Sequence, residues 1–195
     1  MPGERHERAD AARNRRAILQ ATEELLSSRR PAEVTIEQVA ATAGVGKGTV
    51  FHRFGSRMGL MVALMQERAL ELGELVEHGP PPLGPGAPPQ ERLLAFLTAV
   101  VEVVGRNKGL LAALGHAVTA APRSHGEDHP VYRFWHGHIS ALLADARPDL
   151  DADVIADLLL AGLNTEPTLR LLELGESRRL AASLRVLAAG ILNAS

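Results

Sequence analysis

The stretch that decides the fold is TIEQVAATAGVGKGTVFHRFGSRMGL, residues Thr35–Leu60. Thr35 is placed to cap a helix, and Gln38, three residues later, completes a capping box. Gly44 supplies a left-handed residue that can end this helix at low energetic cost. A second, shorter helix is expected to start almost at once, over Lys47–Phe54. The stretch therefore predicts two helices joined by a very short turn.

This helix pair has the pattern of a helix-turn-helix that binds duplex DNA. The first helix, Thr35–Ala43, has an apolar face that can support the second, whose small first residues let its N-terminus enter the major groove. Lys47 can reach a base edge or a phosphate. The alternative is that Lys47 and Arg57 are ordinary charged side chains in water and that the Phe51 ring packs against the domain instead of contacting DNA. The candidate DNA-binding residues are Thr35, Gly46, Lys47, Gly48, Thr49, Phe51, His52 and Arg57.

The quoted stretch, with the preceding ILQATEELL (Ile18–Leu26), resembles the DNA-binding domain of the TetR family of transcriptional repressors. The resemblance implies an all-α chain, with a three-helix DNA-binding domain over residues 10–57 and a larger helical bundle for ligand binding and dimerisation over 58–195. It also implies a homodimer that binds a pseudo-palindromic operator and is released by a small-molecule effector. Gly46 and Phe51 depart from the family pattern. The family usually has Ser or Thr at the position of Gly46, and Tyr at the position of Phe51.

Composition favours a helical chain, and the distribution of charge indicates that only its N-terminal part binds an anionic partner. Alanine and leucine are abundant and aromatic residues are only 3% of the chain, which favours helices over strands. Residues 1–57 contain ten basic and seven acidic side chains, giving +3, so the remainder carries −5 of the total of −2. Arg13, Arg15 and Arg16 are further candidates for contacts along the minor groove or the phosphates.

Apolar periodicity predicts helices throughout the rest of the chain. A Pro- and Gly-rich segment, Gly79–Pro89, is expected to be a linker or loop. Pro167 is expected to kink a long helix that Asp151 caps. The expected helices are 10–28, 35–43, 47–54, 57–78, 90–104, 108–120, 130–146, 152–174 and 178–192.

Two sets of residues are candidates for the regulatory functions that the resemblance implies. Both sets are chosen from helical faces, and both faces could instead form the core of the monomer. The candidate ligand-binding residues, for a small and apolar effector, are Phe96, Val100, Val104, Leu111, Leu114, Trp135, His138, Leu142 and Asn164. The candidate dimer-interface residues are Ile155, Leu158, Leu159, Leu163, Leu180, Leu184, Leu187 and Ile191.

Other classes of protein are less well supported. The chain has no nucleophile elbow, no phosphate loop and no convincing acid–base pair, so no enzyme and no cofactor are expected. His136 and His138 would point to nearly opposite faces of a helix, and His125 and His129 lie in a predicted loop, so no metal site is expected. The absence of cysteine and of a long apolar run fits a cytoplasmic protein. The alternative is a helical interaction protein with weakened or lost operator binding.

Overall fold

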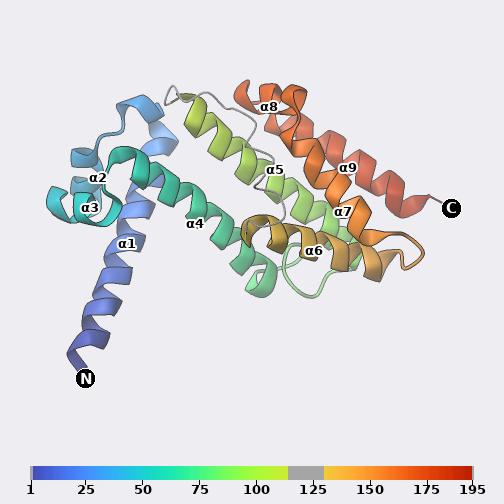
Figure 1. Cartoon of the computed structure of the whole chain (residues 1–195), viewed down its shortest axis with the longest axis horizontal. Helices are drawn as coiled ribbons and strands as arrows, with labels where there is room; N and C mark the ends of the chain where they lie inside the picture. The colour runs from blue at the N-terminus through green and yellow to red at the C-terminus, as the bar shows by residue number, and fades with distance from the viewer. Residues whose placement is uncertain (1, 114–129, 195) are drawn as a thin grey trace. The chain divides into compact units, whose positions relative to one another are not determined.

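The computed structural model describes residues 2–113 and 130–194, which are almost entirely helical and contain no strand (Figure 1). Short 3₁₀ turns lie at Pro31–Glu33 and Gly162–Asn164. The helices of the described residues are α1 (Pro2–Ser28), α2 (Ile36–Thr42), α3 (Lys47–Phe54), α4 (Arg57–His78), α5 (Pro89–Ala113), α6 (Pro130–Ala146), α7 (Ala152–Ala161), α8 (Glu166–Glu173) and α9 (Ser177–Asn193). The expectation of an all-α chain is confirmed.

Local signals define the ends of α2 and α3. The backbone amide of Gln38 donates to Thr35 Oγ1 at 3.3 Å, and the Thr35 amide donates to Gln38 Oε1 at 3.0 Å, which is the predicted capping box. Gly44 has a φ of +68°, a conformation that L side chains rarely adopt, and it directly follows the end of α2. The turn between α2 and α3 is therefore set by residues close together in sequence.

The chain divides into two compact units, 1–68 and 69–195. In the first unit, α1 packs against α2 and α2 against α3. The interior of this unit is made of fully buried aliphatic side chains, among them Ile18, Val34, Val39, Val50 and Leu60. Burial of such side chains contributes about 1.5–3 kcal/mol each, and this common interior holds the short helices α2 and α3 in place.

In the second unit, α5 packs against α6, α8 and α9, and α6 packs against α7 (Figure 1). Its core contains buried aliphatic residues of all these helices, together with Phe96 of α5. Asp151 caps α7 as predicted, because its carboxylate accepts a hydrogen bond from the Val154 amide at 3.2 Å. No helix among the described residues is both long and apolar enough to cross a bilayer.

Two predictions about helix boundaries are wrong. The predicted break between residues 104 and 108 is absent, because α5 continues through Gly105. A Cβ atom added at Gly105 would lie 3.1 Å from Ser177 Cβ and 3.3 Å from Leu172 Cδ2, so this glycine permits close helix packing rather than ending the helix. The predicted kinked helix 152–174 is instead two helices, with Pro167 in the first turn of α8, where proline costs no hydrogen bond.

Candidate nucleic-acid interface

The helix α3 is exposed on one side and anchored on the other. Val50 is 0% exposed and fixes the helix to the interior of the first unit. Lys47, Gly48, Thr49 and His52 are all exposed, so the predicted DNA-facing residues lie on an accessible surface. Polar groups on a short, rigidly held helix with a small residue near its start can approach the edges of bases.

The N-terminus of α3 has no side-chain cap. Gly46 is the N-cap residue, in an extended conformation with φ of −70° and ψ of 145°, and no side chain accepts a hydrogen bond there. Its carbonyl accepts backbone hydrogen bonds from Thr49 at 2.9 Å and Val50 at 3.4 Å. The amides at the start of α3 therefore lack the side-chain oxygen that Ser or Thr would provide. This is expected, because the sequence has glycine at position 46, where the family usually has Ser or Thr.

Lys47 is already paired within the helix-turn-helix. Its ammonium group forms an ion pair with Glu37 of α2 and lies 5.6 Å from the centroid of the Phe51 ring. Both partners of the ion pair are about half exposed, and the hydrogen bond from Lys47 holds the pKa of the Glu37 carboxyl below its ordinary value. Phe51 is exposed, so the ring contributes to this surface rather than to the core. Lys47 would have to leave Glu37, or share its charge, to reach a phosphate.

Arg57 has a structural role that the sequence did not predict. Its Nε donates to the carbonyl oxygen of Val34 at 2.8 Å, and its Nη2 donates to the carbonyl of Pro31. The side chain is partly buried and connects the start of α4 to the turn before α2. Arg57 is therefore not a plain solvated charge, and much of its hydrogen-bonding capacity is directed toward the backbone of its own domain.

Two of the three arginines expected to contact the minor groove or the phosphates also have partners within the first unit. Arg15 forms an ion pair with Glu67 at 3.5 Å and lies 5.6 Å from the centroid of the Phe54 ring. Arg13 forms an ion pair with Asp10, and Arg16 is exposed. All three lie on α1, within the helix that the sequence predicted over 10–28.

Most of the candidate ligand-binding residues form the core of the second unit. Phe96, Val100 and Leu142 are buried in its hydrophobic cluster, and Val104 and Trp135 pack against that cluster. These residues therefore follow the alternative stated above, in which the predicted face forms the core of the monomer. The side chain of Leu111 and the whole of Leu114 lie outside the described residues, and Asn164 is exposed at the end of a 3₁₀ turn, which does not suit an interior pocket.

His138 is the candidate ligand residue with unusual chemistry. Its ring meets Phe96 edge-on, with centroids 4.6 Å apart, and its Nε2 atom is buried without a hydrogen-bond partner in the described part of the chain. Burial, together with the nearby Arg92 guanidinium, lowers the pKa of His138 to about 4. The buried Nε1 of Trp135 and Nε of Arg92 also lack partners among the described residues.

The candidate dimer-interface residues divide into three groups by burial. Leu159, Leu163 and Leu184 are buried in the monomer's own core, the alternative that the sequence left open for these helical faces. Helical periodicity cannot distinguish a residue of the monomer core from a residue of a dimer interface, since both require an apolar face. Leu158 and Leu187 are exposed, at 68% and 57%. The remaining three residues, Ile155, Leu180 and Ile191, are partly buried against the core.

One groove was missed by the sequence reasoning. It lies between α4 and α6 of the second unit and has a volume of about 300 Å³. Its α4 residues include Leu70, Gly73, Glu74 and Glu77, which follow the i, i+3, i+4, i+7 spacing of one helical face and could have indicated a common surface. No cluster of metal-ligating side chains occurs in residues 2–113 and 130–194, and His125 and His129 fall outside these ranges.

The fold and the exposed α3 surface define a protein of the helix-turn-helix class. Residues 18–64 match the family model described as bacterial regulatory proteins, tetR family. This segment of the chain is a TetR-family domain, and the predicted resemblance is confirmed.

Curated relatives are similar over part of the chain only. An HTH-type transcriptional regulator of Mycobacterium tuberculosis is 30% identical over 95 residues, which are 49% of this chain and 46% of the relative. The HTH-type transcriptional regulator BetI 1 of Chromohalobacter salexigens is 37% identical over 62 residues, which are 32% of this chain and 31% of the relative. The chain thus matches less than half the length of each.

Solved structures extend the similarity of fold to nearly the whole chain. A TetR-like transcriptional regulator from Rhodococcus sp. RHA1 has a TM-score of 0.54 at 22% identity, covering 93% of this chain and 97% of that one. A TetR transcriptional regulator from Streptomyces coelicolor also has a TM-score of 0.54 at 22% identity, covering 92% and 96%. At this level of identity the comparison shows that the chain has the TetR-type fold.

Proposed function

We propose that this protein is a ligand-responsive transcriptional regulator, acting as a repressor, that binds a pseudo-palindromic operator as a cytoplasmic homodimer. The observation that carries the proposal is the anchored and accessible helix α3. On this helix the side chain of Val50 is fully buried, while those of Lys47, Thr49 and His52 are exposed. A recognition helix needs both properties, because base reading requires a rigid support and free polar groups.

The Lys47–Glu37 ion pair is compatible with operator binding. Both side chains are exposed, so the pair is screened by solvent and is expected to contribute little to stability. A phosphate can therefore compete with Glu37 for the ammonium group. We propose that Lys47, Gly48, Thr49 and His52 make the main contacts to DNA. Thr35, Gly46 and Phe51 would border this surface, and Arg57 would chiefly position the domain.

Duplexes selected from a random pool by the full-length protein test this function. Selected sequences should contain two related half-sites, and binding should weaken steeply as the salt concentration rises. Lys47→Ala should weaken binding to every selected duplex and reduce the slope of log affinity against log salt by about 1. Arg178→Ala removes the same charge from an exposed position on α9 and should leave that slope unchanged.

The same selection tests the alternative function. The missing side-chain cap at Gly46 is the feature that favours an interaction protein with lost operator binding. Recovery of no preferred duplex, with a folded protein, would support that alternative and contradict the proposed regulator.

Exposed apolar side chains on α7 and α9 support the proposed homodimer. Val154, Leu158, Val186 and Leu187 are 51%, 68%, 75% and 57% exposed in the single chain. Large apolar side chains gathered on neighbouring helices are costly to leave in water and are typical of partner surfaces. A double variant, Leu158→Asp with Leu187→Asp, should sediment as a monomer. Leu75→Asp, at an exposed position of α4, is the matched control and should not change the oligomeric state.

A further inference from the structure

We propose that the groove between α4 and α6 binds an organic cation with a small apolar or aromatic body. The residues of α4 that line the groove are Ala69, Leu70, Gly73, Glu74 and Glu77, and those of α6 are Pro130, Val131 and Phe134. The inference rests on the proposed function, since it names the class of effector for a ligand-responsive regulator. It is argued from the shape, the lining and the charge of this groove.

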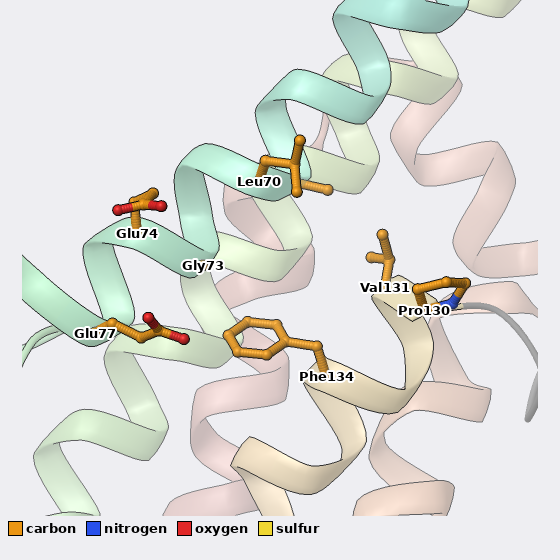
Figure 2. A pocket seen from close by; sticks show the side chains of 8 residues that line it. Leu70, Gly73, Glu74, Glu77, Pro130, Val131 and Phe134 are labelled. Carbon is orange, nitrogen blue, oxygen red and sulfur yellow. The ribbon is translucent and has the colours of Figure 1, made fainter.

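The shape of the groove depends on a glycine that faces an aromatic ring. A Cβ atom added at Gly73 would lie 3.7 Å from both Cε1 and Cζ of Phe134, an ordinary van der Waals distance, so the ring faces this glycine and leaves room for about one methyl group between them. Figure 2 shows the Phe134 ring reaching from α6 toward α4, with Leu70 and Val131 farther along the same space. The volume of about 300 Å³ is at the lower end of the range of about 300–1,000 Å³ that is common for small-molecule sites.

The charge of the groove has a single sign. Glu74 and Glu77 belong to its lining, and none of the described lining residues is basic. Figure 2 shows the Glu77 carboxylate on the side of the groove that the Phe134 ring also borders. Glu74 has no ion-pair partner among the described residues, and the only partner recorded for Glu77 is the adjacent His78, at 4.0 Å. Among the described lining residues, no basic side chain offsets these two carboxylates, which lie beside an apolar surface.

This combination of groups selects a cation over a neutral or anionic molecule of the same size. The carboxylates attract a positive charge, and the face of a phenyl ring attracts it as well through the ring quadrupole. Leu70, Val131 and the ring provide apolar contact for the body of the ligand. A quaternary or protonated amine that carries a phenyl or short alkyl group satisfies all three features. An inorganic cation would not use the apolar part of the groove.

A pair of probes with matched bodies and opposite charges tests the proposal. Benzyltrimethylammonium and phenylmethanesulfonate are titrated separately into the full-length protein carrying labelled Leu and Val methyl groups, and chemical shifts are followed by NMR. The ammonium probe should shift the Leu70 and Val131 methyl signals saturably, with an affinity at least about tenfold higher than that of the sulfonate. Equal affinities, or shifts confined to other methyl groups, would overturn the proposal.

Variants separate the site from general electrostatic attraction. The double variant Glu74→Gln with Glu77→Gln should weaken the ammonium probe at least about tenfold. Its matched control, Glu91→Gln with Glu102→Gln, removes the same charge from exposed positions of α5 and should bind the probe like the wild type. Phe134→Leu keeps an apolar side chain but removes the ring, and should lower the preference for the cation. Unchanged binding in the Glu74 and Glu77 variant would contradict the assignment.

Failure of this inference is distinguishable from failure of the proposed function. Operator selection by the free protein involves no ligand, so it succeeds or fails independently of the groove. Absence of probe binding together with operator binding would overturn the groove assignment alone. Probe binding without any selected duplex would support the groove assignment and contradict the regulator.

Discussion

The Arg57 side chain donates through Nε to the carbonyl oxygen of Val34 at 2.8 Å, across 23 positions of sequence. This contact, together with that to Pro31, joins the first turn of α4 to the segment that leads into the helix-turn-helix. A charged donor bound to backbone carbonyls positions the domain without any need for DNA. The residue therefore has a function in the free protein that is separate from any phosphate contact.

Replacement of this arginine should lower stability. Arg57→Ala leaves two partly buried carbonyls without their charged donor and should lower the free energy of unfolding by about 1.5–3 kcal/mol. Chemical denaturation of the full-length protein, followed by circular dichroism, measures the change. Lys47→Ala is the comparison, since its exposed ion pair should contribute less than about 1 kcal/mol. Equal stability of Arg57→Ala and the wild type would contradict the positioning role.

An added methyl group at Gly59 should destabilise the start of α4. Its Cβ would lie 2.0 Å from the carbonyl oxygen of Phe54, so the backbone would have to shift. Gly59→Ala should lower the free energy of unfolding by about 1–3 kcal/mol, in the range of overpacked sites. A melting temperature equal to or above that of the wild type would show that α4 begins differently.

The opposite effect on stability is expected at Gly48, in the first turn of α3. A Cβ atom there would meet nothing within 4 Å, and alanine favours a helix over glycine by up to about 1 kcal/mol. Gly48→Ala should therefore stabilise the protein, while it weakens operator binding about tenfold if the backbone approaches the bases closely. Thermal denaturation and a binding titration on the same sample measure both effects. Undiminished operator affinity would contradict the predicted close approach.

A serine at the N-cap of α3 should strengthen this helix. The conformation of Gly46 is accessible to any L residue, and an added Cβ would make only an ordinary contact, 3.7 Å from Thr49 Oγ1. Gly46→Ser should raise the free energy of unfolding by about a few tenths of a kcal/mol, because its hydroxyl can accept from a free amide. Gly46→Ala adds the carbon without the oxygen and should lower stability. If both variants change stability equally, the effect is not capping.

His138 should make the stability of the second unit depend on pH. Its pKa is about 4 in the folded protein, against an ordinary value of 6.5, so the unfolded chain binds the proton more readily. Stability is then highest above about pH 6.5 and falls as the pH is lowered toward 4. Denaturation of the wild type and of His138→Leu across this range measures the effect. Between about pH 4 and 6.5 the stability of the variant should depend less on pH than that of the wild type. An equal dependence in both proteins would show that other groups cause it.

Several features of this protein followed from the sequence alone. The capping box of Thr35 and Gln38, the left-handed Gly44 and the bounds of α3 and α4 were all predicted and are present in the structure. Each depends on groups within a few positions of one another, so the local sequence contains all the interacting partners. The family resemblance came from the same local stretch.

Only the tertiary structure decided which apolar and polar groups meet at long range. Helical periodicity placed Leu158 and Leu159 on one apolar face, yet Leu158 is exposed and Leu159 is in the core. Gly105 looked like a helix break but allows α5 to approach Ser177. Phe134 faces Gly73, about sixty positions away, and both residues line the groove between α4 and α6. Periodicity shows which residues share a face, but the packing of distant helices determines what that face contacts.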